Sequence, residues 1–282
     1  MWDPTTYLRY SDERSRPFAD LVSRIGAESP RAVVDLGCGP GTLTETLAQR
    51  WPRARISGLD SSTEMIDRAR SRHSRVSYAV ADVWDWTPES DVDVVVCNAV
   101  LQWVPDHAEL LTRWAGALRP GSWLGVQVPG NFDALSHRAM RAAAAAPAWA
   151  DRLAAATRAR TVRDPDGYAS LLAGAGCAVD AWETTYVHLL PVTAGDDHPV
   201  LRWMEGTALR PVRAALGEGP DWAAFRRDLN GRLADAYPAR DGVVYFPFRR
   251  VFVVARTGAD GSARTGAEDP ARTGVASSEG EA

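Results

Sequence analysis

The segment 33–41 constrains the fold of this chain more than any other feature of its sequence. It reads VVDLGCGPG: a short apolar run with the acidic residue Asp35, followed by glycines at every second position, Gly37, Gly39 and Gly41. Glycines let the backbone turn tightly and approach a ligand where a Cβ atom would clash, and the helix-like segment that follows presents free N–H groups. This arrangement is typical of the nucleotide-binding corner of a doubly wound α/β domain, so we expect a nucleoside or dinucleotide ligand.

The run 55–60 reads as a second short strand that ends in an acidic residue, Asp60. Asp60 lies at the distance past the glycines at which a carboxylate accepts hydrogen bonds from ribose hydroxyls. Directly after it, Ser61 and Glu64 form an S-x-x-E capping box, which places Asp60 at a strand-to-helix junction, where such ligands bind. Because Ser61 already supplies the helix cap, the pattern favours a ligand role for Asp60.

Further runs continue the alternation of strands and helices. The run 76–83 carries the acidic residue Asp82 near its end, and the apolar run 93–100 is typical of a central parallel strand buried on both faces. Later strands are predicted over 122–128, 178–190 and 243–255. Helices are predicted over 11–26, 42–50, 62–72, 106–118, 134–160 with a break at Pro147, and from Pro165 to near Gly174 or Gly176. This alternation implies right-handed crossovers and a parallel sheet.

Composition narrows the class of protein. The chain has 282 residues, 45% of them hydrophobic, so it can bury one large core without two domains. No apolar run approaches a membrane span and the start lacks signal-peptide features, so we expect a soluble cytoplasmic protein. The net charge of −4 argues against nucleic-acid binding. Cys38, Cys97 and Cys177 lack metal-ligand spacing; we expect buried thiols and no metal.

The glycine spacing narrows the choice of ligand. Dinucleotide enzymes show G-x-G-x-x-G, whereas the pattern here is G-x-G-x-G. Together with Asp35, it resembles the motif of class I S-adenosylmethionine (SAM) methyltransferases. The resemblance implies SAM as methyl donor, Asp82 at the adenine amino group, and the end of the fourth strand, from Asn98 to Trp103, at the sulfonium. The expected cofactor-binding residues are Tyr7, Asp35, Gly37, Gly39, Gly41, Asp60, Ser61, Asp82, Val83 and Asn98.

The same resemblance implies an α/β fold that is Rossmann-like, with a mostly parallel seven-stranded sheet and an antiparallel last strand. The insertion between the last two strands, about 191–242, carries helical patterns at 200–216 and 222–237. We expect it to form a helical lid over the active site. The methyltransferase domain then spans 1–256. The tail 257–282, in which Ala-Arg-Thr-Gly recurs, is expected to be disordered.

Several blocks outside these general motifs resemble one family, the trans-aconitate 2-methyltransferases. The matching blocks lie at 2–4, 7–8, 13–17, 36–41, 60–62, 101–107, 184–188, 206–211 and 246–255. The resemblance covers residues 2–256, essentially the whole folded chain. It implies methylation of one carboxylate of a tricarboxylic acid, which gives a monomethyl ester and S-adenosylhomocysteine.

A carboxylate acceptor makes few chemical demands on the protein. Carboxyl groups titrate near about pH 4, so the attacking oxygen is already anionic and no general base is required. The protein must hold that oxygen in line with the S–CH₃ bond and clamp the spare carboxylates, for which arginine is best suited. The candidates for this clamp are Arg14, Arg16, Arg210, Arg249 and Arg250. One of Arg14 and Arg16, and one of Arg249 and Arg250, is expected to face the site, because the members of each pair point different ways. Arg210, on the predicted lid, is the strongest candidate, although any one of these arginines could be a surface residue or part of an ion pair.

Other polar side chains could contact the ligands, and each has a structural alternative. Gln102 and Trp103 follow the fourth strand, where they could bond the substrate and wall off the methyl group, although Trp103 could equally belong to the core. Tyr186 and His188 share one face of a strand, so they could line the pocket or form a buried hydrogen-bonded pair. Tyr7 could close an N-terminal flap over SAM or only pack that segment.

Three other functions fit parts of this pattern. A SAM-dependent methyltransferase of a different small-molecule hydroxyl, amine or carbon acceptor would usually need a base, and His188 would then be catalytic. A SAM-binding regulator would bind the cofactor without turnover. A nicotinamide dehydrogenase is disfavoured by the glycine spacing. The expected partner is a small-molecule polycarboxylate, with no nucleic acid and no membrane, and the protein is expected to be a monomer or homodimer.

Overall fold

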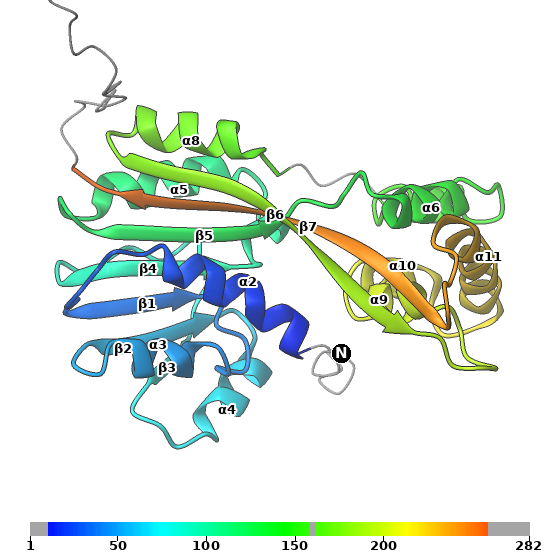
Figure 1. Cartoon of the computed structure of the whole chain (residues 1–282), viewed down its shortest axis with the longest axis horizontal. Helices are drawn as coiled ribbons and strands as arrows, with labels where there is room; N and C mark the ends of the chain where they lie inside the picture. The colour runs from blue at the N-terminus through cyan, green and yellow to red at the C-terminus, as the bar shows by residue number, and fades with distance from the viewer. Residues whose placement is uncertain (1–10, 158–161, 259–282) are drawn as a thin grey trace, which may run out of the picture.

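The computed structural model describes residues 11–157 and 162–258, which contain one seven-stranded sheet (Figure 1). Its strands are β1 (Ala32–Leu36), β2 (Arg55–Asp60), β3 (Ser77–Val80), β4 (Val92–Asn98), β5 (Trp123–Pro129), β6 (Ala178–Pro191) and β7 (Val243–Arg256). The order across the sheet is β3-β2-β1-β4-β5-β7-β6. The first five strands pair in parallel, and β7 runs antiparallel to both β5 and β6. The predicted fold class is therefore confirmed.

The helices lie close to their predicted positions. They are α2 (Ser11–Ser23), α3 (Thr44–Arg50), α4 (Thr63–Arg70), the short 3-10 helix η1 (Leu101–Trp103), α5 (His107–Ala117), α6 (Leu135–Ala144), α7 (Ala150–Leu153), α8 (Pro165–Gly174), α9 (Pro199–Glu205), α10 (Arg210–Leu216) and α11 (Pro220–Ala236). The stretch 200–216, predicted as one helix, is two helices, α9 and α10. Pro211 is the second residue of α10, where its missing N–H is tolerated, whereas inside a continuous helix it would break the hydrogen-bond ladder.

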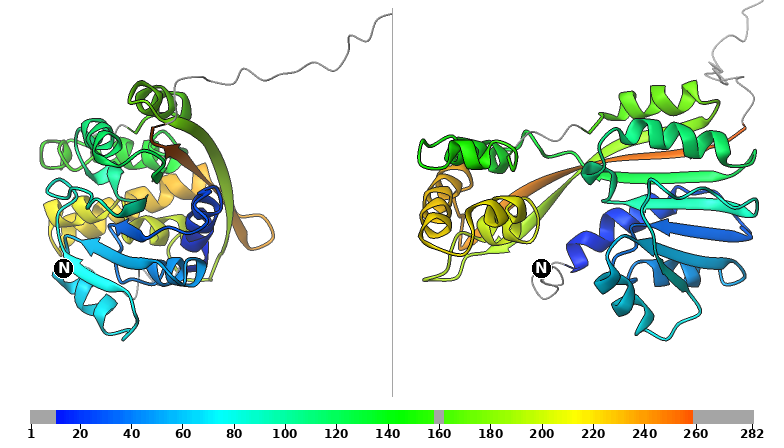
Figure 2. Two further views of the ribbon diagram at one scale, coloured as in Figure 1. Left: turned by 90° about the vertical axis from the view of Figure 1, so that its left-hand side faces the viewer. Right: turned by 180° about the vertical axis from the view of Figure 1, so that it is seen from behind.

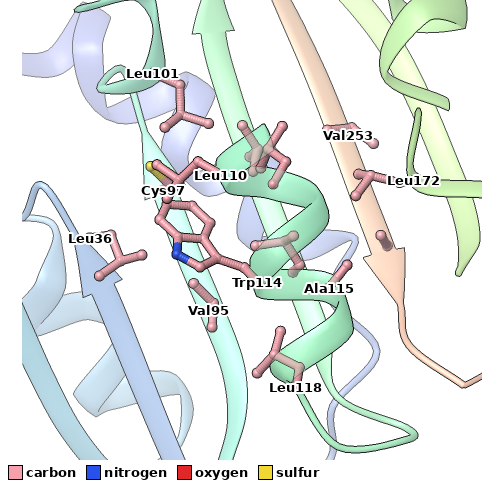
Figure 3. Packing of buried hydrophobic residues seen from close by; sticks show 14 of the residues in the cluster. Leu36, Val95, Cys97, Leu101, Leu110, Trp114, Ala115, Leu118, Leu172 and Val253 are labelled. Carbon is pink, nitrogen blue, oxygen red and sulfur yellow. The ribbon is translucent and has the colours of Figure 1, made fainter. Parts of the chain in front are cut away.

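Helices cover both faces of the sheet, which explains the apolar sequences of its central strands (Figure 2). Successive residues of β1 serve opposite faces: Val34 packs in the cluster that includes α5 and α8, and Val33 in the cluster that includes α2, α3 and α4. In the first cluster the indole of Trp114 is fully buried near Val95 and Cys97 (Figure 3). Truncating such a residue to alanine typically costs about 3–5 kcal/mol.

The outer halves of β6 and β7 leave the sheet and carry a group of helices. β5 pairs with β7 from Arg250 to Arg256, whereas β6 pairs with β7 along its whole length, so the hairpin continues beyond the sheet. Figure 1 shows α6, α9, α10 and α11 gathered on this extension, beyond the ends of the parallel strands. These helices and α7 pack around a core of their own, which includes Trp203 and Phe246 from α9 and β7.

We call these five helices, with the outer ends of β6 and β7, the helical cap. The lid predicted over 191–242 covers only its second part, because α6 and α7 precede β6 in the chain. Contacts between α6 and α11 bring the two parts together. The helical cap is therefore formed by two separate segments of the sequence, and the sequence predicted only the second of them as part of the lid.

Two local details differ from the sequence expectations. Helix α4 begins one residue later than the capping box assumes, so its cap is Ser62, whose hydroxyl accepts a hydrogen bond from the N–H of Met65 at 3.3 Å, and not Ser61. Thr257, assigned to the tail, is buried, and its hydroxyl accepts a hydrogen bond from the N–H of Ser122 at 3.1 Å. The remainder of the tail, from 259, lies outside the described residues.

The three cysteines are free and buried, as predicted. Burial raises the pKa of each thiol, most strongly for Cys38 and Cys97. None of the helices in the described ranges has the length and apolar character needed to cross a membrane.

Candidate active site

A cavity of about 640 Å³ lies between the carboxyl ends of the central strands and the helical cap. Its sheet side is formed by the glycine loop after β1 and by the segments that follow β2, β3 and β4. Its cap side is formed by the segment from the end of β5 into α6 and by parts of α9, α10 and β7. In open α/β sheets, ligands bind at this end of the strands.

The glycine loop contains three glycines with positive φ, and their surroundings give them different roles. A Cβ atom on Gly37 would lie 2.1 Å from Cγ2 of Val100, and one on Gly41 would lie 2.6 Å from the hydroxyl of Tyr78, so close packing requires both glycines. A Cβ on Gly39, where φ is +53°, would have no described atom within 4 Å, and Gly39 lines the cavity. Bare backbone facing open space is the cradle that a closely approaching ligand needs.

Two carboxylates lie beside this cradle in fixed orientations. The Oδ2 atom of Asp60 accepts a hydrogen bond from the N–H of Gly39, and its Oδ1 atom accepts one from the N–H of Ser62, both at 2.9 Å. The Oδ1 atom of Asp82 accepts one from the N–H of Trp84 at 2.8 Å. Each carboxylate retains lone pairs for a ligand. The predicted cofactor residues that line the cavity are Gly37, Gly39, Asp60, Ser61, Asp82, Val83 and Asn98.

Among the described residues predicted to bind the cofactor, Asp35 and Gly41 are not in the cavity lining. Asp35 is buried beneath the loop, where its Oδ2 atom accepts a hydrogen bond from the hydroxyl of Thr44 at 2.6 Å and burial raises its pKa to about 7. Asp35 therefore ties the loop to α3 and is separated from the cavity. Gly41 packs against Tyr78 instead of a ligand. Tyr7 lies outside the described residues.

The chain turns sharply toward the cavity after β4. Ala99 adopts a φ of +57°, which is rare for a residue with a Cβ atom. Two hydrogen bonds hold it there. Its N–H donates to the carbonyl of Gln127 at 2.8 Å, and its carbonyl accepts a hydrogen bond from Nε2 of Gln102 at 2.7 Å. The Oδ1 atom of Asn98 is buried, and no described residue donates to it. Trp103 lines the cavity and is 46% exposed, so it is not a core residue.

The adjacent arginines of β7 point in opposite directions, as predicted, and Arg250 is the one that lines the cavity. Arg250 is buried, its guanidinium carbon lies 4.6 Å from the ring centroid of Phe248, and its Nη1 atom makes a long hydrogen bond of 3.4 Å to Oε1 of Gln127. Arg249 instead forms an ion pair with Glu183 on β6, with an Nε–Oε2 distance of 2.8 Å. Arg249 therefore stabilises the hairpin and does not reach the cavity.

The other predicted arginines are divided between the cavity and the surface. Arg210 is the first residue of α10 and lines the cavity from the helical cap. Arg16 lies exposed on α2 and is not among the lining residues. Arg14 lies in the same helix, and its side chain is outside the described part of the chain. Of the five arginines proposed from the sequence, the structure brings Arg210 and Arg250 to the cavity.

Tyr186 and His188 share a buried face of β6, as predicted, but neither is among the residues that line the cavity. The hydroxyl of Tyr186 donates to Oδ2 of Asp20 on α2. The ring of His188 stacks on Trp203 with centroids 4.6 Å apart and lies 6.4 Å from Phe246, inside the core of the helical cap. This face of β6 is covered by α2 and by cap side chains, and Trp203 and Phe246, which contact His188, themselves line the cavity.

Sequence reasoning missed the segment that leads from β5 into α6. It contributes to the cavity Pro129, Asn131, Phe132, Ser136, His137, Met140 and Arg141. Burial and the nearby Arg141 lower the pKa of His137 to about 4, so its imidazole is neutral at pH 7. One signal could have found this wall: Asn131 lies three residues after the predicted end of a strand at Val128, near the place where polar residues of this sheet meet ligands. The alanine-rich sequence that follows carried no such signal.

Comparison with known proteins connects this cavity to an enzyme family. A family profile described as a methyltransferase domain matches residues 33–121. A trans-aconitate 2-methyltransferase of Mycolicibacterium gilvum (strain PYR-GCK) is 56% identical over 259 residues, which cover 91% of this chain and 99% of the relative. The chain belongs to the trans-aconitate 2-methyltransferase family. A member from Rhodococcus jostii (strain RHA1) is 56% identical, over 91% of this chain and 99% of the relative. One from Mycobacterium tuberculosis (strain ATCC 25177 / H37Ra) is 51% identical, over 92% of this chain and 97% of the relative.

Solved structures share the fold at low sequence identity. The YcgJ protein of Bacillus subtilis superposes with a TM-score of 0.55 at 12% identity, over 86% of this chain and 98% of that protein. Phosphoethanolamine N-methyltransferase 2 of Haemonchus contortus, solved with S-adenosylhomocysteine, gives 0.51 at 15% identity, over 86% of this chain and 52% of that one. As a member of the trans-aconitate 2-methyltransferase family, the chain is a methyltransferase that uses SAM as methyl donor.

Proposed function

We propose that this enzyme esterifies one carboxylate of trans-aconitate, or of a closely related polycarboxylate, and releases S-adenosylhomocysteine and a monomethyl ester. The observation that carries the proposal is the buried Arg250, which lines the same cavity as the glycine loop in a chain so similar to relatives of that name. A buried guanidinium beside an apolar ring is a strong binding group for a carboxylate, because little water competes for it.

The cofactor occupies the sheet side of the cavity in this proposal. When bound, SAM supplies a methyl group made electrophilic by its positively charged sulfur. Asp60 accepts hydrogen bonds from the ribose hydroxyls, and Asp82 accepts one from the adenine amino group. Gly39 gives the ligand close access to the backbone. The buried Oδ1 atom of Asn98, to which no described residue donates, is an acceptor available to the amino acid end of the ligand.

The acceptor occupies the cap side, and the protein acts on it by positioning. A carboxylate acceptor is anionic at neutral pH, so no residue has to remove a proton from it. Arg250 and Arg210 hold spare carboxylates. Gln102 keeps the chain after β4 turned toward the cavity, and the half-exposed Trp103 forms part of the cavity wall. Holding the attacking oxygen in line with the methyl group can supply a large part of the rate enhancement, because misaligned encounters are avoided.

One observation favours a second candidate, a hydroxyl or amine acceptor. His188, the base expected for such chemistry, lies outside the cavity lining, but the neutral imidazole of His137 lines the cavity and could accept a proton. His137→Gln separates the two functions. It should nearly abolish methylation of a hydroxyl or amine, because the base is lost, and it should leave most of the activity on a carboxylate.

The decisive experiment is mass spectrometry of products formed from SAM and a panel of acids: trans-aconitate, cis-aconitate, citrate and isocitrate. We expect a monomethyl ester, formed fastest from trans-aconitate. Binding of S-adenosylhomocysteine without methylation of any acid would overturn the proposal and direct the search to neutral acceptors.

We further propose that the domain acts in the cytoplasm as a monomer or homodimer, with residues 1–256 as the catalytic unit. Size-exclusion chromatography with light scattering, and the activity of a chain truncated after Gly258, test these points.

A further inference from the structure

Three arginines in the described part of the chain line the cavity, and they come from three different elements. Arg250 lies on β7, Arg210 begins α10, and Arg141 lies near the end of α6. The acidic residues among the lining residues are Asp60 and Asp82, both on the sheet side. The charges are therefore separated, with carboxylates on the side assigned to the cationic cofactor and guanidinium groups on the cap side. This separation favours an acceptor with several negative charges.

Arg141 is held in place by a hydrogen bond to the segment between β5 and α6. Its Nη1 atom donates to the carbonyl of Phe132 at 2.8 Å, which fixes the guanidinium against the turn between β5 and α6. Its ion pair with Asp133 is weak: the Nη2–Oδ1 distance is 3.6 Å and the carboxylate is fully exposed. An ion pair of this kind contributes little and is easily exchanged, so a substrate carboxylate can compete for the same guanidinium.

Asn131 presents a second donor from the same segment. Its carbonyl accepts a hydrogen bond from the N–H of Ala134 at 3.0 Å, so its backbone starts the turn into α6. Asn131 is only 5% exposed, its Nδ2 atom is buried, and no described residue accepts a hydrogen bond from that atom. Leaving a buried amide donor without an acceptor costs free energy. Asn131 lines the cavity, so a ligand oxygen can supply the missing acceptor, and a carboxylate has only acceptors to offer.

We propose that Asn131 and Arg141 form a second carboxylate-binding subsite, separate from Arg250, that selects acids carrying a third carboxylate. The inference rests on the proposed function, in which one carboxylate of a tricarboxylic acid is methylated and two remain to be held. Arg250 and Arg210 hold one of these two, and the segment from β5 into α6 binds the other. His137, which lies between Asn131 and Arg141 in the chain, is neutral at pH 7, so it adds no second positive charge that would compete with Arg141 for the carboxylate. The substrate preference is therefore set in part by a segment outside the lid that the sequence predicted.

The test compares trans-aconitate with glutaconate, itaconate and mesaconate, dicarboxylates that each lack one of its three carboxylates. Arg141→Gln should lower kcat/KM for trans-aconitate about ten- to hundredfold, mainly through KM, because a charge-assisted hydrogen bond is lost. For the dicarboxylate that lacks the carboxylate bound by Arg141, kcat/KM should stay within about threefold of wild type. Asn131→Ala should move the same ratio in the same direction, and Arg141→Lys should restore part of it.

Arg138→Gln is the matched control, because Arg138 lies on the exposed side of the same helix and is not among the lining residues. It should leave every rate and the Kd for S-adenosylhomocysteine, measured by calorimetry, unchanged. If Arg141→Gln fails to bind that ligand because it does not fold, Arg141→Lys and Asn131→Ala decide. Unchanged selectivity in the folded variants would overturn the subsite and leave the proposed function intact. A wild-type enzyme that methylates none of the acids would overturn the proposed function, and the subsite with it.

Discussion

Alanine substitutions at Gly37 and Gly39 should separate the two roles of the glycine loop. At both positions φ is positive, so an alanine pays about 1–2 kcal/mol for the left-handed conformation. At Gly37 the added Cβ would also lie 2.1 Å from Cγ2 of Val100, and forcing extra volume into a packed site costs about 1–3 kcal/mol more. We therefore expect Gly37→Ala to lower the free energy of unfolding by about 2–5 kcal/mol. Gly39→Ala should lower it by only about 1–2 kcal/mol, because the new Cβ meets no described atom within 4 Å.

Cofactor affinity should follow a different order from stability. The Cβ in Gly39→Ala points into space that we assign to SAM, so the Kd for S-adenosylhomocysteine should rise about tenfold or more. Gly176→Ala is the control for backbone strain alone: its φ is +80°, its Cβ would meet no described atom, and it lies after α8, outside the cavity lining. It should lose about 1–2 kcal/mol of stability with an unchanged Kd. Urea unfolding and calorimetry measure both quantities. Equal stability losses at Gly37 and Gly39, or an unchanged Kd in Gly39→Ala, would contradict the assignment of Gly37 to packing and of Gly39 to cofactor binding.

Three further predictions concern single side chains. Arg250→Gln should lower kcat/KM for the acid about tenfold or more with an unchanged Kd for S-adenosylhomocysteine, whereas Arg249→Gln should retain activity; equal activities would contradict the assignment. Because the pKa of Asp35 is raised to about 7, its protonated carboxyl contributes stability at low pH that is lost as the pH rises from about 4 to 7. Asp35→Asn should therefore gain stability relative to wild type between pH 5 and pH 8. Urea midpoints that change in parallel with pH in the two proteins would contradict this. Tyr168→Phe removes the buried 2.9 Å hydrogen bond to Nε2 of His107 and should cost about 1–3 kcal/mol in urea unfolding, without changing cofactor affinity.

The sequence predicted the sheet side of the cavity because its signals are local. Each strand carries its own apolar pattern, and a polar residue ends the strand, as at Asp60 and Asn98, or follows it by two positions, as at Asp82. Parallel pairing brings these ends together without further information. Asp35 was assigned to the cofactor because it precedes the glycines, but the strand alternation and Thr44 turn it beneath the loop. In the sequence, an acidic residue before the glycines looks the same whether it is buried or binds a ligand. Only the tertiary contact with Thr44 shows that Asp35 is buried.

The cap side could be predicted only in part, because its residues meet through long-range pairing. Alternation along β7 shows that Arg249 and Arg250 face opposite ways, but the register decides which one faces the cavity. In the structure Arg250 pairs with Pro129 at the last position of β5, and a slip of one residue would exchange the two arginines. Tyr186 and His188 illustrate the same limit: their shared face was predicted, but what covers that face depends on α2 and the helical cap.

The two halves of the cavity also differ in how they relate to the wider enzyme class. The general methyltransferase domain matches residues 33–121, and the described residues that we propose to bind SAM, including Asp60, lie inside that range. Arg141, Arg210 and Arg250 all lie beyond it, on elements that belong to the helical cap or on the strand that carries it. We therefore expect that Arg141 can change without disturbing the proposed cofactor site, because no described hydrogen bond or ion pair of Arg141 reaches the glycine loop. For the same reason, substitution of Arg141 should alter KM for the acid before it alters the affinity for SAM.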